Sequence, residues 1–129
     1  MDYRILPHGG EQISVIGLGM GSIHAASTDK VVRSLHEALD AGVNYFDFVP
    51  SEASAFEGYA RAFRDRRDRA LFQVHIGADY GGGAYGWTTD ASVAIPQFEE
   101  RLRTLGTDYA DFGFIHCIDE DAAFDAVMN

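Results

Sequence analysis

Segments with the apolar pattern of strands and of helices alternate four times along this chain of 129 residues. Runs of apolar and aromatic residues mark the strands, and apolar residues repeating every three or four positions mark the helices. We predict strands at 15–19, 43–49, 71–76 and 109–116 and helices around 31–39, 56–63 and 95–105. A helical crossover between successive strands is the signature of parallel βαβ units, so the pattern predicts an α/β fold with a parallel sheet.

Turn residues and helix-end residues predict further features of the fold. Residues 3–6 and 12–14 flank the turn Pro7–Gly10 and predict a β-hairpin. The wholly apolar stretch 15–19 predicts a strand buried on both faces. Pro96 predicts that the third helix starts or kinks there, and Gly106 predicts its end. Residues 119–128 read as the first turns of a helix that stops without a cap, so we expect the chain to be part of something larger.

The charge balance excludes some classes of partner. Ten Lys and Arg against twenty Asp and Glu give a net charge of −10, which repels phosphate backbones and anionic lipid. Five of the basic residues lie between Arg61 and Arg69, and we interpret that run as a solvated helix end. Nucleic acid and membrane surfaces are therefore not expected partners.

One cysteine, Cys117, allows neither an intrachain disulfide nor a cysteine metal knuckle. No apolar run approaches the roughly 20 residues of a membrane span, and the amino terminus lacks a signal-peptide core. These observations predict a cytoplasmic protein.

Three segments together resemble the amino-terminal half of the aldo/keto reductase family. They are Ile13–Gly21 (ISVIGLGMG), Ala38–Phe48 (ALDAGVNYFDF) and Leu102–His116 (LRTLGTDYADFGFIH). The resemblance implies a (β/α)8 TIM barrel of about 250 residues or more. Residues 1–129 would then form a single partial barrel domain, truncated after the hairpin and four βα units.

Two further stretches, 46–56 and 72–81, resemble a bacterial branch of the family. Members of that branch often carry a ferredoxin-like iron–sulfur segment after the barrel. These residues carry one cysteine, which cannot hold a cluster, and nothing in them shows such a segment.

The family reduces carbonyls with NADPH, using Asp, Tyr, Lys and His at the carboxyl ends of barrel strands. Carried over by position, the resemblance assigns catalytic roles to Asp47 and His116. The Tyr position is Glu52 and the Lys position is His75, so the tetrad is altered. In the family the Tyr protonates the alkoxide, and here Glu52 or a histidine would have to replace it.

Tyr80 and Tyr85, in the glycine-rich loop 77–86, are alternative proton donors. The loop composition fits either a mobile lid or a plain surface connection.

The resemblance also implies a nicotinamide cofactor, NADP(H) or NAD(H). Gly19 and Met20, at the end of the first barrel strand, are candidate contacts near its ribose. A G-x-G-x-x-G cradle is not formed, because the position of the third glycine is Ser22. The family holds the cofactor phosphates mainly on its last two βα units, which these residues do not reach.

Side chains alternate along a barrel strand, so Tyr45, Gln73 and Phe114 should point inward one layer below the site. We interpret the ionisable strand ends as an active site, functional or decayed, against the alternative of buried ion pairs and packing. No resident metal is predicted, although His75, His116 and Asp47, with Glu52 nearby, make an alternative divalent-metal set.

The expected function is an aldo/keto reductase-like oxidoreductase that reduces small carbonyls or oxidises alcohols, inactive as these residues alone. The alternative is a non-catalytic half-barrel that self-associates or binds a partner, because a half-barrel leaves its inner face and two strand edges open.

Overall fold

The computed structural model describes residues 1–19, 21, 23, 25–49, 53–79, 86–115 and 117–128, with only the backbone of residues 53 and 54. The strands are β1 (Tyr3–Ile5), β2 (Gln12–Ser14), β3 (Gly17–Gly19), β4 (Tyr45–Phe48), β5 (Leu71–Ile76), β6 (Ala78–Asp79), β7 (Gly86–Trp87) and β8 (Phe112–Ile115). The helices are α1 (Thr28–Asp40), α2 (Ala53–Phe63), α3 (Ala91–Leu105) and α4 (Asp121–Met128), with a 3-10 turn η2 (Arg67–Arg69).

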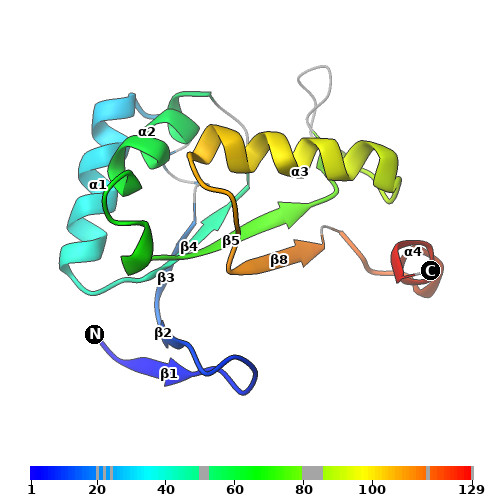
Figure 1. Cartoon of the computed structure of the whole chain (residues 1–129), viewed down its shortest axis with the longest axis horizontal. Helices are drawn as coiled ribbons and strands as arrows, with labels where there is room; N and C mark the ends of the chain where they lie inside the picture. Colours follow the sequence, from blue (N-terminus) through cyan, green and yellow to red (C-terminus); the bar gives the residue numbers. More distant parts are fainter. Residues whose placement is uncertain are drawn as a thin grey trace.

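Four strands form a parallel sheet in the order β3-β4-β5-β8. Helices α1, α2 and α3 lie on one side of it, and the antiparallel β1-β2 hairpin lies at the opposite side, below the sheet in Figure 1. The predicted α/β class, the parallel sheet and the opening hairpin are confirmed.

The core lies between the helices and the outer face of the sheet. Phe46 and Phe48 of β4 and Phe72 of β5 are almost fully buried there. Tyr59 of α2 packs edge-on against Phe48, with ring centroids 4.2 Å apart, and Phe63 packs similarly on Phe72 at 4.9 Å. Because side chains alternate along each strand, burying this set turns the residues between them to the inner face.

Two predicted elements differ from the structure. The first barrel strand is only Gly17–Gly19, and Val15 and Ile16 are 50% and 59% exposed, so a strand buried on both faces was wrong. The reason is that the sheet ends at β3, where the described residues place no second neighbouring strand.

Helix α3 starts five residues before Pro96, which was expected to mark its start or a kink, and continues through it. The Asp90 side chain caps the helix by accepting a hydrogen bond from Ser92 N at 2.8 Å, which is the reason for the early start. The end at Gly106 is confirmed, and its φ of 72° is a left-handed conformation that suits glycine.

The arginine run 61–69 was wrongly interpreted as wholly solvated. Arg61 is exposed and pairs with Asp29, but the Arg67 side chain is 17% exposed. Its guanidinium carbon lies 3.9 Å from the Phe72 ring centroid and 4.0 Å from that of Tyr109. Helix α2 ends before this residue, and Arg67 reaches Ala70 O and Asp111 Oδ2, just before β5 and β8 begin.

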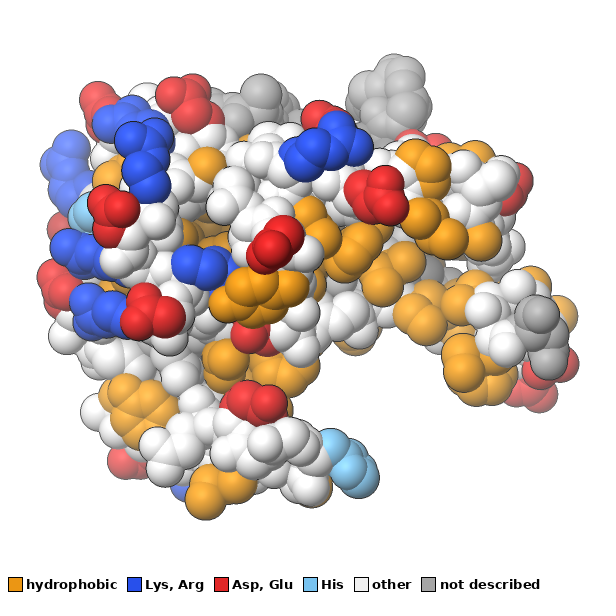
Figure 2. All heavy atoms as spheres, in the orientation of Figure 1, with side chains coloured by type: hydrophobic (Ala, Val, Ile, Leu, Met, Phe, Trp, Pro, Cys, Tyr) orange, Lys and Arg blue, Asp and Glu red, His pale blue; other side chains and the backbone are white. Residues whose placement is uncertain are grey.

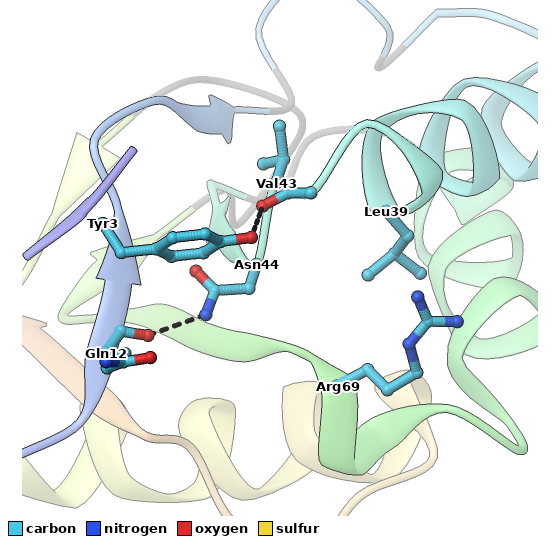
Figure 3. Close-up of a pocket in the computed structure, with 7 residues that line it drawn as sticks. Tyr3, Gln12, Leu39, Val43, Asn44 and Arg69 are labelled. Carbon is cyan, nitrogen blue, oxygen red and sulfur yellow. Dashed lines mark hydrogen bonds between the residues drawn. The ribbon is translucent and has the colours of Figure 1, made fainter. Parts of the chain in front are cut away.

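Figure 3 shows a pocket of about 360 Å³ where the hairpin meets the amino end of β4. Tyr3 Oη donates to Gly42 O at 2.8 Å, and Asn44 Nδ2 donates to Gln12 O at 2.7 Å. These hydrogen bonds attach the hairpin to the barrel at the end of the strands opposite Asp47.

The inner face of the sheet is open. Figure 2 shows a hollow below the sheet between the hairpin and α4, with hydrophobic side chains gathered toward α4. Phe114 of β8, which shares this face with His75, is 48% exposed, and Phe124 and Met128 of α4 are also exposed.

Candidate active site at the strand ends

The candidate site is built on the carboxyl ends of β4 and β5. Asp47 projects from β4 to the inner face, and His75 projects from β5 beside it. His75 Nε2 lies 2.8 Å from Asp47 Oδ1. A carboxylate only accepts hydrogen bonds, so this geometry places the proton on Nε2. The structure thus brings together two of the four predicted catalytic residues.

A polar row continues below this pair. Gln73 Nε2 donates to Asp47 Oδ1 at 2.8 Å, and the Tyr45 hydroxyl donates to Gln73 Oε1. The phenol fixes the orientation of the Gln73 amide, so its amino group faces the Asp47 carboxylate. Burial, and then the charge of Asp47, raise the pKa of Tyr45 above its ordinary value, which keeps its hydroxyl a donor.

His75 is held by packing and by its backbone. The residue is 6% exposed, and its ring centroid lies 4.8 Å from that of Phe114, the facing residue of β8. Arg101 Nη1 of α3 donates to the His75 carbonyl at 2.7 Å. The imidazole therefore has a restricted orientation toward Asp47.

Gly19 lies opposite Asp47 in the β3–β4 register. Among the described residues, a Cβ added at Gly19 would meet only Asp47 Oδ2, at 3.9 Å. The contact of Gly19 with a nicotinamide ribose stays a prediction.

Several predicted site residues lie outside the described residues. They are Glu52, His116 and Met20, together with the alternative donors Tyr80 and Tyr85. Their roles stay predictions. The described strands β6 and β7 pair with each other antiparallel.

The metal hypothesis depends on the same residues. Within the described residues, no group of three or more His, Cys, Asp or Glu side chains could hold a metal ion. Asp47 and His75 make only a pair there, so a metal set would require Glu52 or His116.

Sequence reasoning placed Gln73 on the inner face but missed its bond to Asp47, and it missed Arg101 altogether. Arg101 is 9% exposed although it is charged. The only sequence signal was that Arg101 lies beside Leu102 in the helical repeat. That position does not distinguish a buried arginine from a solvated one.

None of the helices in the described ranges is long and apolar enough to cross a membrane.

A parallel sheet with helices on its outer face and ionisable groups at its carboxyl ends defines part of a (β/α)8 barrel with a polar site. The chain belongs to the aldo/keto reductase family, whose sequence model matches residues 15–129. The expected family and partial barrel fold are confirmed.

Among curated proteins, the chain is 26% identical to L-glyceraldehyde 3-phosphate reductase of Escherichia coli, over 94% of this chain and 38% of that protein. Among solved structures, it resembles the holo form of an aldo-keto reductase of Bacillus halodurans, with a TM-score of 0.80 and 23% identity over 98% of this chain and 45% of the other. It also resembles an aldo-keto reductase of Klebsiella pneumoniae in complex with NADPH, with a TM-score of 0.67 and 23% identity over 98% of this chain and 44% of the other.

The chain therefore spans less than half the length of each of these relatives. The matches do not show the iron–sulfur segment that members of the resembled branch often carry.

Proposed function

We propose that this chain carries the catalytic strand ends of a nicotinamide-dependent oxidoreductase that reduces small carbonyls or oxidises alcohols, with His75 and Asp47 as its proton-donating pair. The observation that supports it is the 2.8 Å hydrogen bond between His75 Nε2 and Asp47 Oδ1 at the open inner face. The single cysteine, which excludes an intrachain disulfide, favours a cytoplasmic location.

NADPH or NADH, when bound, supplies the hydride to the carbonyl carbon. Asp47 and Gly19 are the described residues that would lie beside its ribose. The phosphates would be held by residues beyond those described in this chain.

Reduction leaves an alkoxide that needs a proton. Histidine is the side chain that most readily exchanges a proton near neutral pH. Because the Nε2–H of His75 is donated to Asp47, the proton for this oxygen would come from Nδ1 of the imidazolium. Asp47 holds the ring in place and stabilises the imidazolium before transfer, and Gln73 holds Asp47. In alcohol oxidation the same nitrogen takes the proton back.

The first experiment is a fluorescence titration of the purified protein with NADPH and with NADH, with the mass measured by light scattering in the same sample. We expect no turnover from these residues alone. The catalytic test therefore uses a chimera in which this chain replaces the amino-terminal half of the Bacillus halodurans relative, on whose structure it superposes over nearly its full length.

The chimera should oxidise NADPH with short aldehydes such as glyceraldehyde. His75→Gln and Asp47→Asn should each lower kcat by roughly 100-fold or more, the usual contribution of a positioned general acid. His8→Gln, on the exposed hairpin turn, is the matched control and should keep the full rate. A folded chimera that binds NADPH but retains its rate after His75→Gln would contradict the proposal.

A second candidate is a half-barrel that assembles with another copy of itself. The described sheet has unpaired edges at β3 and β8, and apolar side chains of β8 and α4 are exposed beside one of them. Exposed edges and apolar patches of this kind favour association. Light scattering that gives the 14.1 kDa monomer at micromolar concentration would contradict it.

A further inference from the structure

His75 lies at the carboxyl end of β5, where β5 pairs with a described strand on one side only. The pairing of β5 with β4 ends at Val74, opposite Phe48. In the described sheet His75 therefore has only β8 as a strand partner, through the pair with Phe114. Its position must be fixed by other elements as well.

Immediately after β5 the chain turns a corner at Gly77. The φ of Gly77 is 82°, and a Cβ added there would lie 2.6 Å from Thr88 O. Thr88 N donates to Gly77 O at 2.7 Å, which ties the corner to the end of the β6–β7 hairpin. A displacement of this corner would move both His75 and the hairpin.

Arg101 of α3 spans the same corner from the helix side. Nη1 donates to His75 O at 2.7 Å, and Nη2 donates to Ala78 O, so one guanidinium holds the carbonyls on both sides of Gly77. One turn earlier on the same helix, Gln97 Nε2 donates to Asp79 Oδ1 at 2.9 Å. The two side chains form a polar stripe that attaches α3 to the exit of β5.

The chemistry of arginine suits this task. Its planar guanidinium offers several donors in a fixed geometry, so a single side chain can hold two carbonyls at a set separation. Arg101 is 9% exposed, and a charged group that is nearly removed from water needs such polar contacts. A lysine has three donors on a flexible stem and lacks the rigid fork that sets the separation of the two carbonyls.

We propose that Arg101 is a positioning residue that fixes the His75 imidazole against Asp47 by holding the His75 and Ala78 carbonyls. It acts through the backbone and does not touch the reacting atoms. The catalytic part of this inference rests on the proposed function, whereas the structural part does not.

The test compares Arg101→Met and Arg101→Gln with Arg103→Met. Arg103 lies on the same helix, is exposed and pairs with Glu100, so it is a matched control. Two readouts are independent of activity. They are the ring NMR signals of the 13C-labelled histidines, with His75 assigned by His75→Gln, and hydrogen exchange of peptides covering 75–79 and 86–88.

In both Arg101 variants the His75 ring signal should shift or broaden, and exchange in the two peptides should rise by roughly tenfold or more, while α1 and β4 exchange as before. Arg103→Met should change neither readout. In the active chimera, Arg101→Gln should lower kcat by about 10- to 100-fold with KM nearly unchanged, because misplacing a catalytic group costs rate rather than binding.

A native His75 signal and native exchange in folded Arg101→Met would overturn the inference. If that variant does not fold, Arg101→Gln decides the question in the same way. A chimera that retains Arg101 but is inactive would overturn the proposed function and leave the structural inference standing. The His75 ring signal and the hydrogen exchange would still test the role of Arg101.

Discussion

The two faces of the parallel sheet have opposite characters. The outer face presents Phe46, Phe48 and Phe72 to the helices, and each is at most 1% exposed. The inner face presents Tyr45, Gln73, Asp47 and His75, joined by hydrogen bonds, and Phe114 beside them is 48% exposed. The outer face is a closed apolar core, whereas the inner face is a polar row bordered by an open surface.

The contrast shows how one strand serves two purposes. Phe46 and Phe48 hold β4 against the helices, and Asp47 between them faces the inner side, where we propose that it positions the His75 ring. Substitutions on the outer face should therefore alter stability, whereas those on the inner face should alter activity. The predictions below test this division.

The largest effect is expected for Phe72→Ala. Its ring contacts Phe48 and Phe63 and lies under the guanidinium of Arg67, and removing it leaves a cavity. The free energy of unfolding should fall by about 3–5 kcal/mol, measured by urea denaturation. A loss below about 1 kcal/mol would mean that the outer face is not the closed core described here.

A smaller loss, about 2 kcal/mol, is expected for Arg67→Met, because it leaves a largely buried carboxylate without its cation. Arg67 Nη2 lies 2.7 Å from Asp111 Oδ2, which also accepts from Phe72 N at 2.7 Å. Arg61→Met is the control, because the exposed Arg61–Asp29 pair should contribute no more than about 0.5 kcal/mol. Equal losses in the two variants, measured by urea denaturation, would contradict the assignment.

Tyr59→Phe should raise the free energy of unfolding by about 1 kcal/mol, because the substitution removes a buried hydroxyl that lacks a partner. Tyr59 is fully buried, and its hydroxyl has no hydrogen-bond partner in the described structure. Tyr3→Phe is the control and should destabilise, since the Tyr3 hydroxyl donates to Gly42 O.

Tyr59 also predicts how the stability of the protein depends on pH. Burial, and then the charge of Asp47, raise the pKa of Tyr59 far above its ordinary value. The folded state therefore keeps this proton while the unfolded chain loses it, so stability should fall as the pH rises above about 10. In Tyr59→Phe the fall should be shallower, as measured by urea denaturation between pH 8 and 11. An unchanged slope would contradict this origin.

The smallest effect is expected for Phe114→Ala on the inner face. The half-exposed ring contacts His75 but fills no closed core, so stability should fall by less than about 1 kcal/mol. The measurement is repeated at two protein concentrations. A loss close to that of Phe72→Ala, or one that grows with concentration, would mean that a second copy covers this face.

Local sequence patterns predicted the elements and their faces. The period of two in β4 and β5 placed Asp47, His75 and Gln73 on one face, because alternation along a strand follows from backbone geometry alone. The helical repeats predicted α1, α2 and α3 for the same reason, since Val31, Leu35 and Leu39 share one side of a 3.6-residue helix.

Only the tertiary structure decided which polar groups meet. A local pattern treats an arginine as solvated, yet Arg67 lies between two aromatic rings and Arg101 holds the exit of β5. Tyr109 lies 42 residues from Arg67 along the chain and the His75 carbonyl lies 26 residues from Arg101, so the sheet must form before these groups come within reach. The Asp47–His75 contact has the same origin, because hydrogen-bond distances between strands depend on a register that neither strand encodes by itself.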